Sequence, residues 1–346
     1  MQSATDWVAS LSAWPKDGFG LERMQALLDR LGRPERRYEA IHVVGTKGKS
    51  TAARTVAALL RGEGIAAAAY TSPHVAGWEE RLDTDAAGFD AAVQRVRADA
   101  ELLDATQFEI LTAAALLDFA ERGIDVAVVE AGLGGRLDAT NVVDAAVVLL
   151  TNVGLEHTEV LGSTREAIAG EKLAVARPDA VVVLPDTEFA SLVPGRDIRT
   201  GGARAAAEAF LGRPTDAEVE VRLAGRLEVR EGEVRDGAHT PEAVDWLLDR
   251  LPGPRDYVVV ASILGDKDAD GILERLARAG GTLIATRSSN DRALPAAAVA
   301  ARGGRFFPTV LEIEEPEAAL ARARGLGKPV LVTGSLYLLA DLSKED

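Results

Sequence analysis

The sequence predicts an α/β protein with two domains, each built on a parallel sheet. Short apolar runs alternate with segments of helical periodicity along most of the chain, which is the pattern of repeated strand–helix units. The clearest unit begins with the apolar run at 40–44, continues through a glycine-rich turn and ends in a helix-like run at 52–61. A chain of 346 residues is also long enough for two domains.

The glycine-rich turn has the residues of a phosphate-binding loop. It comprises Gly45, Thr46, Lys47, Gly48, Lys49, Ser50 and Thr51. In such a loop, backbone N–H groups and a helix N-terminus face the anion, Lys49 reaches the β- and γ-phosphates, and a hydroxyl of Ser50 or Thr51 holds Mg²⁺. The usual pattern has one more glycine, at the position of Val43. A glycine turn capped by Ser50 is the alternative, but the flanking strand and helix favour an ATP-binding loop.

Composition excludes several classes of protein. Apolar residues make up 47% and charged residues 27%, which is typical of a globular chain. A net charge of −15 argues against a broad surface for nucleic acid. Without cysteine, the chain has no disulfide, thiol nucleophile or cysteine-based metal site. Residues 1–14 do not resemble a signal peptide, and no apolar run approaches about 18 residues, so we expect a cytoplasmic protein without a membrane span.

Three further helices are predicted in the first half of the chain. Apolar residues at helical spacing mark a packing helix at 21–31. Alanine and charged residues at 90–103 predict an exposed helix. The more apolar segment 108–122 predicts a mostly buried helix that Gly123 ends.

Two predicted strands end in residues suited to binding a ligand. The strand at 66–70 is followed by Ser72 and His74, and the strand at 126–129 is followed by Glu130. Ligands of open parallel sheets bind beyond the carboxyl ends of the strands. Ser72 and Glu130 are therefore candidate metal ligands, and His74 is a candidate partner for a substrate carboxylate. The alternatives are an ordinary Ser-Pro turn and a capping or solvated carboxylate.

The next segments add further candidates. The glycine-rich loop at 131–141 could also be a mobile surface loop. The strand at 145–150 leads to His157, a further metal candidate, whereas His42 lies inside a strand and is expected to be structural. By spacing alone, Lys172 would be an ordinary surface lysine.

A second, smaller α/β unit is predicted from about residue 229. Strands are expected at 257–261, 283–286 and 330–333, and helices at 241–251, 270–279 and 316–324. This alternation predicts a small parallel sheet. Arg226, just before it, is a natural partner for a phosphate.

Several of these motifs resemble the Mur ligase superfamily, and much of the chain resembles its folylpolyglutamate synthase/dihydrofolate synthase branch. The loop at 45–51 is similar to the superfamily's ATP loop, and Thr-Ser-Pro-His at 71–74 is similar to an element of the branch. The most specific match is 130–141, Glu-Ala-Gly-Leu-Gly-Gly-Arg-Leu-Asp-Ala-Thr-Asn. Further similar segments are 236–241, 265–268 and 333–337.

The chain departs from the family pattern at four places. Lys47 and Thr240 each stand where the family has Asn, and Glu156 replaces an Asp. The region 185–222 is short and lacks the family's adenine-contacting Asn.

The resemblance implies both a fold and an activity. It implies an N-terminal P-loop, parallel-sheet ATPase domain at 1–228 and a smaller Rossmann-like glutamate-ligase domain at 229–346. The implied enzyme uses ATP to add L-glutamate to a folate or dihydropteroate carboxylate through an acyl phosphate. The implied catalytic residues are Lys49, His157, Lys172 (as a carbamate), Asp236, His239 and Lys267. Nucleotide binding is implied for the loop Gly45 to Thr51, Arg226 and Asp236. The implied ligands of one or two Mg²⁺ ions are Ser50, Thr51, Ser72, Glu130 and His157.

Two other functions stay open at this point. One is another Mur-type ligase that acts on a cell-wall nucleotide-peptide, and the other is a non-catalytic ATP-binding relative. Small-molecule substrates and a monomer are expected, without nucleic-acid or membrane partners. The sequence leaves open whether the enzyme glutamylates dihydropteroate, extends a polyglutamate, or does both.

Overall fold

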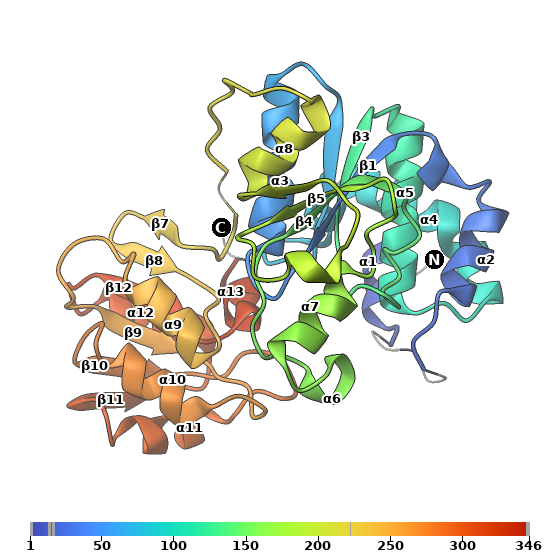
Figure 1. The fold of residues 1–346 in the computed structure, drawn as a ribbon. Coiled ribbons are helices and arrows are strands. Elements are labelled where there is room, and N and C mark those ends of the chain that lie inside the picture. The colour runs from blue at the N-terminus through green and yellow to red at the C-terminus, as the bar shows by residue number, and fades with distance from the viewer. Residues whose placement is uncertain (1–2, 13–14, 16–17, 222, 344–346) are drawn as a thin grey trace. The chain divides into compact units, whose positions relative to one another are not determined.

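The computed structural model describes residues 3–12, 15, 18–221 and 223–343, and the chain forms two compact units (Figure 1). The first unit comprises Met1–His74 and Trp78–Val221, and the second comprises Val75–Gly77 and Arg222–Asp346. The main segment of the second unit thus begins at Arg222, before the domain boundary that was expected at 228/229. Residues 1, 2, 13, 14 and 222, which belong to the segments 1–14 and 185–222 interpreted above, lie outside the described residues.

The first unit is built on a six-stranded parallel sheet in the order β2-β3-β1-β4-β5-β6. Its strands are β1 (Glu39–Val44), β2 (Ala67–Tyr70), β3 (Val126–Glu130), β4 (Ala145–Leu150), β5 (Val181–Leu184) and β6 (Ile198–Thr200). The first four match the predicted strands, whereas β5 and β6 were not predicted. Val43 pairs with Glu130, and Val129 pairs with Tyr70. The carboxyl ends of β1, β2 and β3 therefore lie side by side.

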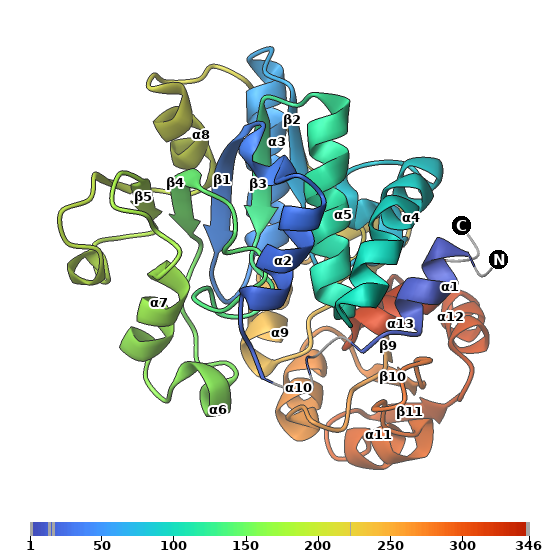
Figure 2. The same cartoon turned by 90° about the vertical axis from the view of Figure 1, so that its right-hand side faces the viewer.

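Helices cover both faces of this sheet (Figures 1 and 2). Ile41 and Val43 pack with α3 and α8, whereas Ala40 and Val44 pack on the opposite face with α2, α4 and α5. This alternation follows from the two-residue period of a strand. The helices are α1 (Ala4–Ala9), α2 (Glu22–Arg30), α3 (Lys49–Gly62), α4 (Ala86–Leu102), α5 (Gln107–Arg122), α6 (Thr158–Leu161), α7 (Arg165–Leu173) and α8 (Ala203–Leu211), with 3₁₀ turns at Pro34–Arg36, Trp78–Leu82 and Ala190–Leu192.

Several helices differ from their predictions in burial or in length. The helix expected to be exposed at 90–103 is α4, and that expectation is wrong for one face, because Val93 and Val96 are fully buried. The face packs against α5, a contact that the helix's own composition does not specify. The helix expected at 241–251 ends at Leu248. Pro252 follows closely, and the residue before a proline disfavours helical backbone.

The second unit contains another six-stranded sheet, in the order β11-β10-β9-β12-β8-β7. Only β7 is antiparallel to its neighbour among these strands. The strands are β7 (Glu228–Arg230), β8 (Glu233–Arg235), β9 (Val258–Ala261), β10 (Thr282–Ala285), β11 (Thr309–Glu312) and β12 (Val330–Thr333). The helices are α9 (Pro241–Leu248), α10 (Ala269–Leu276), α11 (Ala296–Gly303), α12 (Pro316–Arg324) and α13 (Leu336–Leu342). Helices α9, α10 and α11 cover one face of this sheet, and α12 and α13 cover the other.

Within the described ranges, no helix combines the length and apolar character needed to cross a bilayer.

Candidate functional site

The phosphate loop connects β1 to α3, and two glycines permit its shape. Gly45 and Gly48 have φ angles of 146° and 78°, a region that favours glycine. A side chain at Gly45 would also collide with the Thr151 hydroxyl. Helix α3 begins at Lys49, earlier than the predicted start at 52. The backbone N–H groups of its first turn have no carbonyl partner within the helix and are available to an anion.

The two residues that follow β4, Thr151 and Asn152, form hydrogen bonds with the phosphate loop. The backbone N–H of Thr46 donates to the carbonyl of Asn152 at 3.0 Å, and the N–H of Lys47 donates to the Asn152 Oδ1 at 2.9 Å. The carbonyl of Lys47 accepts from Asn152 Nδ2 at 3.0 Å and from Thr151 Oγ1 at 2.7 Å. Sequence reasoning missed these two residues. The available signal was a pair of polar side chains directly after the apolar strand.

Three predicted metal ligands meet beside the loop. Glu130 is the last residue of β3 and is only 2% exposed. Its Oε2 accepts from the backbone N–H of Ser72 at 2.9 Å. Ser50 Oγ donates to the carbonyl of Ser72 at 3.4 Å. The Glu130 carboxylate, the Ser50 hydroxyl and the Ser72 carbonyl are hard oxygen donors, the kind that Mg²⁺ prefers. Thr51 lies on the exposed side of the first turn of α3.

The structure places His157 differently. It is exposed, has a φ of 45° and precedes α6 as its N-cap. Among the described residues, no three His, Asp or Glu side chains are grouped as a metal site.

Lys172 is buried next to the phosphate loop. It is 1% exposed, and its Nζ donates to the carbonyl of Gly45 at 2.9 Å and to Glu156 Oε1 at 2.8 Å. Burial lowers the pKa of the amine, and the Glu156 carboxylate opposes that shift. The interpretation of Lys172 as an ordinary surface lysine is wrong, because α7 turns this side chain towards the loop.

The glycine-rich loop after β3 is packed against α7. A Cβ at Gly135 would lie 2.6 Å from the carbonyl oxygen of Lys172, so only glycine allows this approach. Arg136 donates from its backbone N–H to the carbonyl of Glu171 and pairs with the Glu171 side chain at 3.1 Å. The glycines therefore serve close packing and help to place Lys172.

A buried network anchors the same loop to β1. Asp138 accepts hydrogen bonds from the backbone N–H of Leu133 and from the N–H and hydroxyl of Thr140. The Thr140 oxygen lies 2.9 Å from His42 Nε2. Since the Thr140 hydroxyl donates to Asp138, it accepts from His42, whose Nδ1 lacks a partner among the described residues. Burial lowers the pKa of His42 to about 3, so this histidine is neutral and structural.

His74 is neutral as well. Arg81 Nε donates to its Nδ1 at 3.0 Å, and the Trp78 ring packs on it with centroids 4.3 Å apart. Burial, with the charge of Arg81, lowers the pKa of His74 to about 3. The imidazole can therefore offer a substrate carboxylate an Nε2–H hydrogen bond, but it carries no positive charge.

In the second unit, Asp236 organises the segment after β8. It is 6% exposed and accepts from the backbone N–H of Leu227 at 2.7 Å and of Ala238 at 2.8 Å. Burial raises the pKa of this carboxyl group, while these N–H groups and the charge of Arg226 oppose the rise. His239 Nδ1 lies 2.7 Å from the carbonyl of Gly237.

The residues that follow β8, β12 and β9 lie side by side, in that order across the sheet. The N–H of Gly334, after β12, donates to the carbonyl of Ala238 at 3.0 Å, and a Cβ at Gly334 would lie 2.6 Å from the Ser262 carbonyl after β9. Lys267 lies further along the β9 loop and pairs with Asp266 at 3.0 Å. Thr240 caps α9 by accepting from the N–H of Ala243 at 3.3 Å. Replacement of Asn by Thr at this position thus preserves a helix cap.

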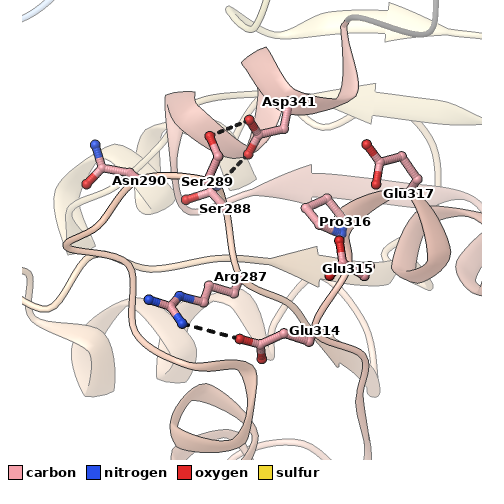
Figure 3. A pocket seen from close by; sticks show the side chains of 9 residues that line it. All are labelled: Arg287, Ser288, Ser289, Asn290, Glu314, Glu315, Pro316, Glu317 and Asp341. Carbon is pink, nitrogen blue, oxygen red and sulfur yellow. Dashed lines mark hydrogen bonds and ion pairs between the residues drawn. The ribbon is translucent and has the colours of Figure 1, made fainter. Parts of the chain in front are cut away.

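A cavity of about 450 Å³ opens beyond β10 and β11 in the second unit (Figure 3). Arg287 pairs with Glu314 at 3.6 Å across it. Asp341 accepts from the Ser289 N–H at 2.7 Å and hydroxyl at 2.6 Å. Carboxylates outnumber cations in its lining, which disfavours anions such as nucleotide phosphates. None of the predicted site residues lines this cavity.

Two domain families match the sequence. The Mur ligase middle domain matches residues 43–192, which include the phosphate loop, Glu130 and Lys172. The Mur ligase, glutamate ligase domain matches residues 225–336, which include Asp236 and Lys267.

Individual proteins show the same similarity. The dihydrofolate synthase/folylpolyglutamate synthase of Mycobacterium tuberculosis is 31% identical over 392 residues, covering 85% of this chain and 80% of the relative. The folylpolyglutamate synthase of Lacticaseibacillus casei is 30% identical over 420 residues, covering 96% of each. A crystal structure of the bifunctional folylpolyglutamate synthase/dihydrofolate synthase from Yersinia pestis, complexed with AMPPNP and Mn ion, has a TM-score of 0.83 and 25% identity, covering 100% of this chain and 98% of that one.

Proposed function

The chain belongs to the Mur ligase family, in its branch of folylpolyglutamate synthases and dihydrofolate synthases, and we propose that it uses ATP to join L-glutamate to the carboxylate of a folate or dihydropteroate. The observation that supports this most directly is the meeting of Ser50, Ser72 and Glu130 beside the phosphate loop. A nucleotide phosphate and a divalent cation can be bound side by side where a helix N-terminus and oxygen donors meet at the carboxyl ends of the strands.

The electrostatics of the reaction fit these residues. ATP-driven amide formation brings two anions together, the acceptor carboxylate and the γ-phosphate, and so requires local positive charge. The chain as a whole carries −15, so the charge has to come from a few placed groups. We assign Lys49 and the N-terminus of α3 to the phosphates. Mg²⁺ held by Ser50, Ser72 and Glu130 would supply the remaining neutralisation.

The proposed chemistry has two steps. A carboxylate oxygen of the acceptor attacks the γ-phosphorus, the bond to the bridging oxygen breaks, and ADP and an acyl phosphate form. The neutral amine of glutamate then attacks the acyl carbon, the C–O bond to the phosphate breaks, and the phosphate leaves with the proton that the nitrogen loses as the amide forms. The protein's part is to align the reactants and to exclude water from the acyl phosphate, since well-oriented reactants can contribute roughly 7–11 kcal/mol at best.

Carbamylation of Lys172 is part of the proposal. The neutral amine would attack CO₂, form the N–C bond and lose a proton, leaving an anionic carbamate. Its support is a buried amine with a lowered pKa next to the phosphate loop. A carbamate would have to move away from the Glu156 carboxylate, because two anions would otherwise meet there.

The second unit is proposed to contribute Arg226, Asp236, His239 and Lys267. Arg226 precedes β7, Asp236 and His239 follow β8, and Lys267 follows β9. Ligands of open parallel sheets bind at the carboxyl ends of strands. Arg226 is assigned to a phosphate and Asp236 to nucleotide binding and loop geometry. His157 stays a proposed metal or substrate ligand. A monomer and a cytoplasmic location stay predictions.

The function is tested by measuring ADP release while each component is omitted. Release should require ATP, Mg²⁺, a pteroate-type acceptor and L-glutamate together, with at most slow leakage when glutamate is absent. Equal release with and without acceptor would identify a plain ATPase. Strict dependence on a cell-wall nucleotide-peptide would identify another Mur-type ligase. No release with any acceptor, and no initial burst, would identify a non-catalytic ATP-binding relative.

The burst measurement matters because of Lys47. A second lysine in the phosphate loop would bind ADP more tightly and slow its release. A weak steady-state rate preceded by a burst of ADP would then still indicate a competent ligase.

A further inference from the structure

We propose that Asn152 is a positioning residue of the phosphate loop, which it holds, together with Thr151, in a binding-ready shape before a nucleotide arrives. This inference rests on the proposed function to the extent that the loop is taken to bind the phosphates of ATP. It concerns a residue that touches the loop backbone and acts through it.

One side chain satisfies both polar groups of the Lys47 peptide. Asn152 Oδ1 accepts from the Lys47 N–H at 2.9 Å, and Asn152 Nδ2 donates to the Lys47 carbonyl at 3.0 Å. Only a side-chain amide offers an acceptor and a donor side by side without ionising. Thr151 Oγ1 adds a second donor to the same carbonyl at 2.7 Å. We call this arrangement the Asn152 clamp.

The pairing of β1 with β4 brings the phosphate loop next to Thr151 and Asn152. Strands β1 and β4 are parallel neighbours, and Val44 pairs with Leu150. The N–H of Thr151 continues this ladder to the Val44 carbonyl at 2.9 Å. Gly45 lies where the Thr151 hydroxyl would collide with any side chain. The glycine that starts the loop and the clamp that holds it therefore require one another.

The backbone carbonyl of Asn152 and the Asn152 clamp together decide which N–H groups of the loop face a phosphate. The N–H groups of Thr46 and Lys47 already donate to Asn152. The phosphates are left with the N–H groups from Gly48 through the first turn of α3, together with the ammonium of Lys49. This is a shorter set of donors than the usual loop offers, in agreement with Val43 at the position of the missing first glycine.

The test compares nucleotide affinity with stability of the full-length protein. Asn152→Ala removes both bonds to the Lys47 peptide, so binding must order a peptide that the clamp has already fixed in the wild type. Its dissociation constant for Mg·ADP, measured by titration calorimetry, should rise on the order of tenfold. The melting temperature without nucleotide should stay close to that of the wild type, because Asn152 is exposed.

Two variants of Thr151 and one control variant test whether a loss of affinity is specific to the Asn152 clamp. Thr151→Val should also weaken Mg·ADP binding, and Thr151→Ser, which keeps the hydroxyl, should restore it. Asp186→Ala is the matched control, because Asp186 is an exposed residue after β5 whose carboxylate accepts a single backbone bond, from Glu188 at 2.8 Å. Its affinity for Mg·ADP should not change.

The outcomes separate this inference from the proposed function. Folded Asn152→Ala and Thr151→Val proteins that bind Mg·ADP like the wild type would overturn the Asn152 clamp, whatever the ligase assay shows. Failure of the wild type to bind Mg·ADP would overturn it too. A wild type that binds Mg·ADP through the clamp but forms no amide would instead contradict only the ligase assignment.

Discussion

Lys172 and Glu156 form an ion pair of 2.8 Å in which the lysine side chain is 2% exposed and the glutamate side chain 25%. The same ammonium donates to the carbonyl of Gly45, the first residue of the phosphate loop, at 2.9 Å. One cation thus links α7, the segment after β4 and the loop. The charge at Lys172, positive as an ammonium or negative as a carbamate, therefore affects the loop directly.

Lys172→Ala should be inactive and less stable. The Gly45 carbonyl loses its donor and Glu156 loses its counter-charge, so we expect the free energy of unfolding to fall by about 1–3 kcal/mol. The measurement is urea unfolding together with turnover in added formate or acetate. Partial recovery of turnover by the short carboxylates would support the carbamate, whereas stability loss without recovery would support the ion pair alone. Wild-type turnover would rule out both roles.

Lys49→Ala should abolish ATP turnover and leave stability nearly unchanged, because a loop lysine supports little of the core. Turnover and melting temperature should be measured on the same preparation. Lys328→Ala is the matched control, since Lys328 forms an exposed pair with Asp256 far along the sequence in the second unit. A folded Lys49→Ala protein with wild-type turnover would remove the phosphate-loop assignment.

Glu130→Gln should raise the Mg²⁺ concentration needed for half-maximal activity. The substitution keeps the size of the side chain and an oxygen for the Ser72 N–H, but it removes the charge that a hard cation prefers. A Mg²⁺ titration at saturating ATP checks this. If the titration curve does not move, Glu130 is not a metal ligand.

His42 should make the protein less stable below neutral pH. Its pKa is about 3 in the folded chain, against about 6.5 in an unfolded one. The unfolded state therefore binds more protons between these values, and stability falls as the pH falls below about 6.5. Between pH 7 and pH 5 this contribution is on the order of 2 kcal/mol.

His42→Gln provides the comparison, because its amide nitrogen can still donate to Thr140 and does not titrate. Urea unfolding at pH 7 and pH 5 should show a smaller loss of stability for the variant than for the wild type. Equal losses for the two proteins would mean that His42 does not titrate as its burial requires.

Much of the chain could be predicted from local sequence. The strands at 40–44 and 145–150, the buried helix ended by Gly123 and the loop around Lys49 were recognisable because periodicity and glycine placement are local properties. Of the strands that were missed, β5 (Val181–Leu184) is an apolar run with a clear local signal that was passed over, whereas others have weak local signals. β6 is short and largely exposed, and β11 lies at the edge of its sheet with exposed ends, so neither has the apolar pattern of a central strand.

The sequence by itself determined the candidates for phosphate and metal binding, since Lys49, Ser72 and Glu130 each follow a recognisable strand. Only the tertiary structure decided how their neighbours behave. His74 is neutral because Arg81 and Trp78 enclose it, Lys172 is buried because α7 packs on Gly135, and Asn152 reaches Lys47 because β4 pairs with β1. Burial, charge and hydrogen bonding at these residues depend on partners distant in the sequence, which local composition does not record.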